Sequence, residues 1–198
     1  MVLDDVAAVV GLDEQGFIAR AGELIDGSLA AVLTACLSVE AAVNELFLAY
    51  QLGTVANLVG LEAGLAQRLS QAWDAGASKL SALEKADLAN VIAGAGSINW
   101  GKAPAQQMGL LNSLRNELVH HKPIWVEQGG APHESTDTLE RKLGSEFPTA
   151  AIWRTRGVPF RWNGCLGAGC ARWACRVADD FNRQIYATLG ARFPLPAL

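Results

Sequence analysis

Residues 115–121 read Arg-Asn-Glu-Leu-Val-His-His and hold two of the chain's three histidines a few positions after a permanent cation. A guanidinium neutralises phosphate charge through bidentate hydrogen bonds, and an imidazole accepts or donates a proton near neutral pH. An arginine and a histidine within one or two helical turns of each other are therefore suited to work on a phosphodiester. We expect most of the functional information in the chain to lie in this segment.

A helix is expected to carry the segment, from about Ala103 or Pro104 to His120. Pro123 disfavours helix at Lys122, so the Arg/His pair falls in the last two turns. Four leucines are expected to point inward from this helix: Leu110, Leu111, Leu114 and Leu118.

Within one straight helix, positions 115 and 120 are about 140° apart. A single copy then aims both side chains at one atom only if the helix ends or distorts at the histidine. A second copy facing the first across a two-fold axis removes that difficulty.

Other helices are expected around this one. A leading helix at about 13–25 is expected to break at Asp26-Gly27-Ser28, and a long central helix to follow at about 29–51. Further helices are expected at about 61–75, 81–93 and 170–192. Ser81 and Glu84 have the spacing of a capping box at the start of the helix at 81–93.

The segment from Lys122 to Ala168 has a different composition, with six Gly, four Pro and three Trp in 47 residues. We expect a long loop with a short hairpin at 151–162. Aromatic and cationic residues alternate there, a pattern typical of single-stranded nucleic-acid contacts. The candidate RNA contacts are Lys122, Trp153, Arg154, Arg156, Arg161 and Trp162. The alternative is that the tryptophans anchor the loop and the arginines are solvated.

These patterns predict an all-α fold, an antiparallel bundle of four to five principal helices with a long loop insertion before the last helix. We expect one domain over residues 1–198, with its core at about 14–121 and 169–192 and the insertion at about 122–168.

Net charge is −4, but it is unevenly spread. Residues 1–114 carry 5 basic and 12 acidic side chains, and residues 115–198 carry 11 basic and 8 acidic ones. An anionic ligand would therefore be drawn to the second part, whereas the sequence pI of about 5.4 argues against broad non-specific coating of DNA.

The four cysteines, at positions 36, 165, 170 and 175, include no Cys-x2-Cys pair, so we expect reduced thiols and neither a metal nor a cofactor. Residues 1–11 lack the basic start of a secretory signal. The apolar run at about 29–39 is interrupted by Glu40, Asn44 and Glu45 before it reaches the length of a membrane span. We expect a cytoplasmic protein without a membrane partner.

Arg115, Asn116 and His120 form the pattern Arg-Asn-x3-His near the end of a bundle helix, after a long helix and before one last helix. This arrangement resembles the HEPN superfamily of all-helical nucleases and nucleotide-binding proteins, over roughly residues 14–192. The resemblance implies a homodimer in which two such helices build a composite cleft. It also implies that active members of the superfamily cut RNA there without a metal ion.

By the same resemblance, Arg115 would contact the scissile phosphate and His120 would transfer a proton during attack by the ribose 2′-hydroxyl. Asn116 would orient one of these groups or the phosphate, and His121 is a second candidate histidine at a longer allowed spacing. A polar residue on the long helix often supports this site in the superfamily. The candidates here are Glu40, Asn44 and Glu45.

One toxin branch of the superfamily continues as His-x-Tyr, and a nucleotidyltransferase antitoxin modifies that tyrosine. Lys122 occupies this position here, a departure from that branch. The resemblance suggests a toxin or a defence effector with an antitoxin or nucleotidyltransferase partner.

Two other interpretations stay open. Arg115 could pair with Glu117 or a neighbouring helix while His120 and His121 cap the end of their helix. Alternatively, the chain could be a non-catalytic dimeric module that binds nucleotide, RNA or a protein partner.

Overall fold

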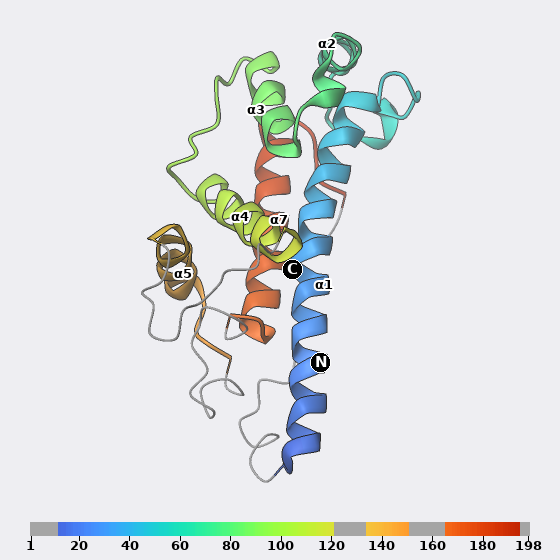
Figure 1. Cartoon of the computed structure of the whole chain (residues 1–198). Helices are drawn as coiled ribbons and strands as arrows, with labels where there is room; N and C mark the ends of the chain where they lie inside the picture. The colour runs from blue at the N-terminus through green and yellow to red at the C-terminus, as the bar shows by residue number, and fades with distance from the viewer. Residues whose placement is uncertain (1–11, 121–133, 151–164, 195–198) are drawn as a thin grey trace. The chain divides into compact units, whose positions relative to one another are not determined.

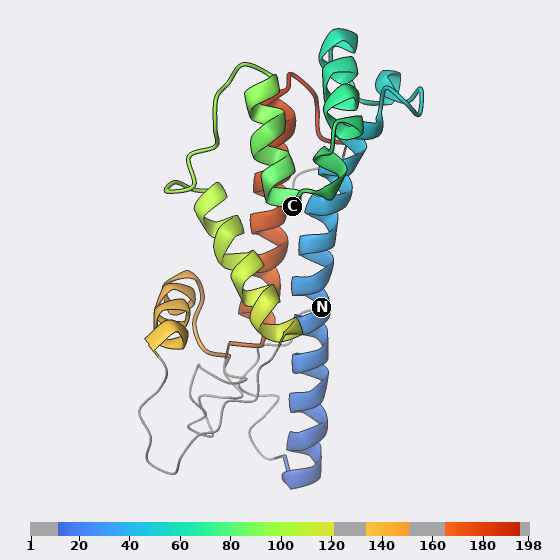
Figure 2. The same ribbon diagram turned by 45° about the horizontal axis from the view of Figure 1, so that its top comes forward.

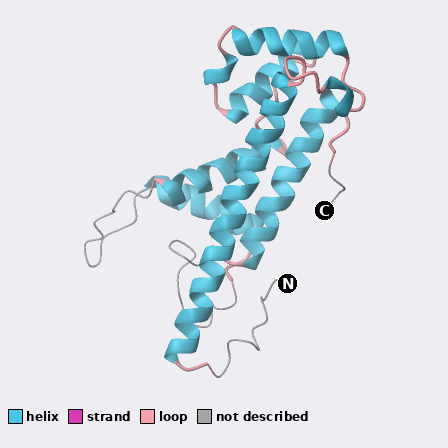
Figure 3. Ribbon diagram, turned by 90° about the vertical axis from the view of Figure 1, so that its right-hand side faces the viewer, coloured by secondary structure: helices cyan, strands magenta, loops and turns pink. Residues whose placement is uncertain are grey.

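The computed structural model describes residues 12–120, 134–150 and 165–194. Every regular element in these ranges is helical and none is a strand (Figure 3), so the predicted all-α class is confirmed. The elements are α1 (Glu14–Leu48), η2 (Val55–Asn57), α2 (Ala63–Asp74), η3 (Ala77–Lys79), α3 (Ala82–Ile92), α4 (Ala105–Val119), α5 (Glu134–Glu146) and α7 (Ala168–Thr188), coloured along the chain in Figure 1.

The contacts divide the chain into two compact units, each assembled from separate stretches. The first unit comprises residues 1–34 and 110–175, and the second comprises residues 35–109 and 176–198. The chain passes from one unit to the other inside α1, α4 and α7.

Helix α1 runs without interruption for 35 residues, so the break predicted at Asp26-Gly27-Ser28 was wrong. Ser28 is buried inside the helix rather than acting as the cap of a new one, and Gly27 lies on its exposed side. A mid-helix glycine costs only about 1 kcal/mol relative to alanine. The burial of neighbouring side chains such as Ala21 and Val32 offsets that cost.

Within the described residues, α1 is the one helix whose length and composition would allow it to cross a membrane. In its apolar 18-residue stretch, 39% is buried inside the structure, and the core helix of a soluble protein can have the same length and composition. The expected cytoplasmic location therefore stays a prediction.

The second unit packs α2, α3 and the later part of α7 with the end of α1. Figures 1 and 2 show α3 lying beside the C-terminal half of α7. The predicted capping box starts α3: Ser81 Oγ accepts from the Glu84 backbone N–H, and the Glu84 carboxylate accepts from the Ser81 N–H over 2.8 Å. Phe47 and Trp73, whose rings are 6.1 Å apart, join α1 to α2.

Helix α7 ends at Thr188, four residues before the predicted end at Arg192, because Gly190 adopts a left-handed conformation (φ +73°). The Ala191 N–H donates to the Tyr186 carbonyl over 2.8 Å and the Gly190 N–H to the Ala187 carbonyl over 3.0 Å. These bonds form the Schellman motif that stops many helices. The backbone after it crosses the α1–α2 connection, where the Arg192 N–H donates to the Val59 carbonyl over 2.7 Å.

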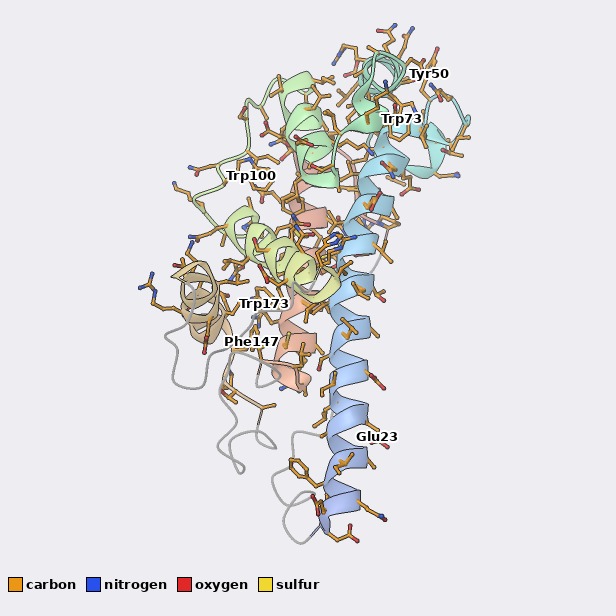
Figure 4. All side chains as sticks on the ribbon, viewed as in Figure 1. Glu23, Tyr50, Trp73, Trp100, Phe147 and Trp173 are labelled. Carbon is orange, nitrogen blue, oxygen red and sulfur yellow. The ribbon has the colours of Figure 1, made fainter. Side chains whose placement is uncertain are left out.

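The first unit contains a helix that sequence patterns missed. α5 lies inside the segment 122–168, which was predicted to be a loop without sustained helix. Leu143 and Phe147 are buried, and the centres of the Phe147 and Trp173 rings are 5.2 Å apart. Figure 4 labels both side chains. Trp173 Nε1 donates to Glu146 over 3.1 Å. The hairpin predicted at 151–162 lies outside the described residues.

Candidate functional site

Helix α4 presents one apolar and one polar face. Met108, Leu111 and Leu114 are buried, and Leu110 and Leu118 are half-buried, as the predicted inward stripe requires. The helix starts directly after Pro104, whose carbonyl accepts from the Met108 N–H. Burial of the leucine stripe fixes the rotation of α4 and leaves the side chains at its C-terminal end on the surface.

Arg115 is half-buried, and its Nη1 donates to the Oδ1 of the exposed Asn116 over 2.9 Å. A carboxylate does not hold it: within the described residues, Arg115 forms no ion pair with Glu117 or with any other acid. The predicted alternative in which Arg115 pairs with Glu117 is therefore wrong for this conformation. A neutral amide leaves the charge of the guanidinium uncompensated and its other N–H groups available to an anion.

His120 is exposed and directly follows the last residue of α4. Its backbone N–H donates to the Asn116 carbonyl over 2.9 Å, the spacing of an α-helical hydrogen bond. The Cα of His120 therefore keeps helical register. By that register, Asn116 projects about 40° and Glu117 about 60° from the direction of His120, on opposite sides of it.

The hydrogen bond to Asn116 brings the Arg115 guanidinium closer to the direction of His120 than the 140° between the two backbone positions indicates. Because the guanidinium bends to the Asn116 amide, its charge is drawn toward the side of α4 from which the histidine projects. Arg115 and Asn116 are thus joined by a side-chain hydrogen bond, and His120 follows one helical turn after Asn116 at the end of α4.

The remaining candidates for direct RNA contact lie outside the described residues. These are His121, Lys122, Trp153, Arg154, Arg156, Arg161 and Trp162.

The three candidate supporting residues lie in the part of α1 that belongs to the second unit. Glu40 is exposed. Asn44 Oδ1 accepts from Lys85 Nζ over 2.9 Å, and Glu45 Oε2 accepts from the Tyr186 hydroxyl over 2.8 Å. Burial, followed by the Glu45 hydrogen bond, raises the pKa of Tyr186 far above its ordinary value, so this hydroxyl stays a donor. Asn44 and Glu45 thus each have a structural partner inside their own unit.

Within the described part of the chain, no group of three or more His, Cys, Asp or Glu side chains is arranged to hold a metal ion. Burial raises the pKa of Cys165 to about 11 and that of Cys170 higher still, so both thiols stay protonated. Neither is suited to act as a nucleophile at neutral pH.

Two residues near these positions escaped sequence reasoning. Glu117, considered there only as a partner for Arg115, has no partner among the described residues. Lys85 is buried although lysines are mostly exposed. Its ammonium contacts Asn44, which lies 41 residues earlier on α1, and the Trp73 ring on α2. The one sequence signal that pointed to either residue was the three-residue spacing between Glu117 and His120.

No family model matches the chain, and neither a curated protein nor a solved structure matches it. The resemblance to the HEPN superfamily therefore rests on the Arg-Asn-x3-His pattern and its placement, and it stays a prediction.

Proposed function

We propose that this chain is a metal-independent endoribonuclease that acts through Arg115 and His120, with two copies forming one composite site. The observation that carries the proposal is the state of Arg115, an arginine that binds an amide instead of a carboxylate and lies five residues before an exposed histidine. A structural arginine is usually neutralised by an acid, whereas a phosphate-binding one keeps its charge for the ligand.

The chemistry needs few groups. In RNA the 2′-oxygen attacks the adjacent phosphorus and the bond to the 5′-oxygen breaks, leaving a 2′,3′-cyclic phosphate and a free 5′-hydroxyl. An imidazole takes the proton from the 2′-hydroxyl, and a protonated imidazole delivers one to the leaving 5′-oxygen. A guanidinium stabilises the charge that develops on the phosphate. The nucleophile belongs to the substrate, so DNA is bound but not cut.

Two copies supply the two imidazoles that this scheme uses, one as base and one as acid. A toxin or defence role, with an antitoxin or nucleotidyltransferase partner, extends the same proposal.

The test is incubation of the purified chain with single-stranded RNA in EDTA, with the products analysed for 2′,3′-cyclic phosphate ends. His120→Ala is expected to lower the cleavage rate by about 10²- to 10⁴-fold, the usual contribution of general acid–base catalysis. Its melting temperature should not change, because the side chain is exposed and has no partner in the described residues.

Arg115→Ala tests the phosphate contact, and Arg68→Ala is its matched control. Arg68 is exposed on α2 and is not one of the proposed site residues, so its loss removes one positive charge and no group of the site. We expect cleavage to fall in the first variant and to persist in the second.

Intact RNA with the wild-type chain would refute the nuclease proposal. If that intact RNA were still bound, and bound less tightly by Arg115→Ala, the non-catalytic module would be the better description.

A further inference from the structure

Glu117 lies one helical turn before His120, and its carboxylate has no ion pair or hydrogen bond with any described residue. Residues three apart on a helix are neighbours, with Cβ atoms about 5–6 Å apart, whereas residues two apart do not face each other. By helical register the Glu117 side chain projects about 60° from the direction of His120 and about 160° from that of Arg115, so the His120 imidazole is within its reach.

The Arg115–Asn116 hydrogen bond strengthens this reading. The guanidinium donates to the Asn116 amide over 2.9 Å and forms no ion pair with the Glu117 carboxylate. The His120 N–H bond to the Asn116 carbonyl, also 2.9 Å, keeps the histidine in helical register beside Glu117. Exposure of both side chains leaves them free to turn toward each other.

We propose that Glu117 is a positioning residue for His120: its carboxylate accepts a hydrogen bond from one imidazole nitrogen and aims the other at the RNA. A carboxylate that accepts from one ring nitrogen selects the tautomer and orientation of the ring. Asn116 on one side and Glu117 on the other would then hold the ring at the end of α4. This inference rests on the proposed nuclease function.

A negative charge beside a phosphate site weakens RNA binding. The proposal therefore predicts that Glu117→Gln slows catalysis but does not weaken RNA binding. Glu117→Gln is expected to lower kcat by about 10- to 100-fold, the range for loss of a carboxylate partner of a functional histidine. Its KM should stay equal or fall, because a charge that repels the RNA has been removed. Glu117→Asp keeps the carboxylate on a shorter side chain and should recover part of kcat.

Glu14→Gln is the control, since it neutralises an equally exposed glutamate in the first turn of α1. It should leave kcat and KM unchanged. Affinity measured with RNA carrying 2′-O-methyl groups, which cannot be cut, checks the binding half of the prediction.

If the wild-type chain cuts RNA and His120→Ala does not, but Glu117→Gln cuts at the wild-type rate, the positioning role is refuted and the nuclease stands. A fall in kcat accompanied by a matching loss of melting temperature would also overturn it, since that pattern indicates a structural role. RNA left intact by the wild-type chain refutes the nuclease itself.

Discussion

Lys85 Nζ donates a hydrogen bond to Asn44 Oδ1 over 2.9 Å, joining α3 to α1 across 41 residues of sequence. Lys85 is only 4% exposed, and its ammonium also lies 4.8 Å from the centre of the Trp73 ring. In the described residues no carboxylate joins this group. An amide oxygen and an aromatic face therefore supply the stabilisation that a buried cation usually takes from an acid.

Asn44→Ala removes the acceptor and leaves a buried ammonium with the ring alone. We expect the free energy of unfolding to fall by about 1.5–3 kcal/mol, the value of a hydrogen bond to a charged group. Urea denaturation followed by tryptophan fluorescence measures it. Lys85→Met, which removes the charge but keeps the volume, should cost less than Asn44→Ala. A loss below about 0.5 kcal/mol in Asn44→Ala would mean that the ammonium reaches water.

Gly60→Ala should be among the most destabilising single changes in the second unit. Gly60 has φ +95°, and an added Cβ would meet the Gly190 carbonyl oxygen closer than real Cβ atoms approach. Backbone strain and overpacking together should cost about 3 kcal/mol or more.

The control for this change is Gly53→Ala. Gly53 has φ +66° and open space around its Cβ position, so only the backbone term of about 1–2 kcal/mol applies. Thermal unfolding of both variants tests the difference, and equal losses would contradict a close approach of the two glycines.

The capping box of α3 makes a prediction about pH. Hydrogen bonds from the Ser81 hydroxyl and backbone hold the pKa of the Glu84 carboxyl below its ordinary value. A carboxyl whose pKa is lowered by folding stabilises above its unfolded pKa, and that stability is lost as the pH falls through the folded pKa. The contribution should therefore be complete at neutral pH and vanish in acid.

Ser81→Ala should lower the free energy of unfolding by about 1 kcal/mol at pH 7. The difference from wild type should shrink as the pH falls through the lowered pKa of the Glu84 carboxyl. Urea unfolding at pH 7, 5 and 3 provides the comparison. A difference that stays constant over this range would show that the Glu84 half of the box contributes nothing.

The thiols should differ in their reactivity toward Ellman's reagent. Cys175 is exposed, while burial raises the pKa of Cys165 to about 11 and that of Cys170 further. Since the thiolate is the reacting form, Cys175 should be labelled first in the native chain. Cys175→Ser should remove the fastest phase and leave at most the slower labelling of the half-buried Cys36, and Cys165→Ser should leave the fastest phase unchanged. More than one labelled thiol in the native Cys175→Ser chain would contradict the burial of Cys165 and Cys170.

Local patterns predicted those elements whose cause is local. The Ser81/Glu84 spacing gave the start of α3, and the leucine stripe gave α4 up to the histidine at its end. The start of α3 and the extent of α4 depend on residues at most a few helical turns apart, so the sequence alone predicts both. The type and order of Arg115, Asn116 and His120 were readable for the same reason.

Tertiary packing decided where prediction failed. Ser28 looks like a cap by itself, but burial inside α1 overrides its preference. Helix α5 was missed because the glycine and proline content of all 47 residues of the segment predicted a loop. Leu139 and Leu143, four residues apart, have the spacing of a helix. Arg115 binds the amide of Asn116 and not the carboxylate of Glu117. That choice depends on side-chain geometry, which the spacing of the residues in the sequence does not resolve.

Helices α1, α4 and α7 each pass from one unit to the other, which limits how the chain can be divided into fragments that fold. No single cut isolates either half, because every helix that would have to be severed supplies residues to both. Excised fragments should therefore be unfolded. Denaturation monitored at Trp173 and at Trp73, one in each half, should follow the same curve, so that damage to either half disables the whole molecule.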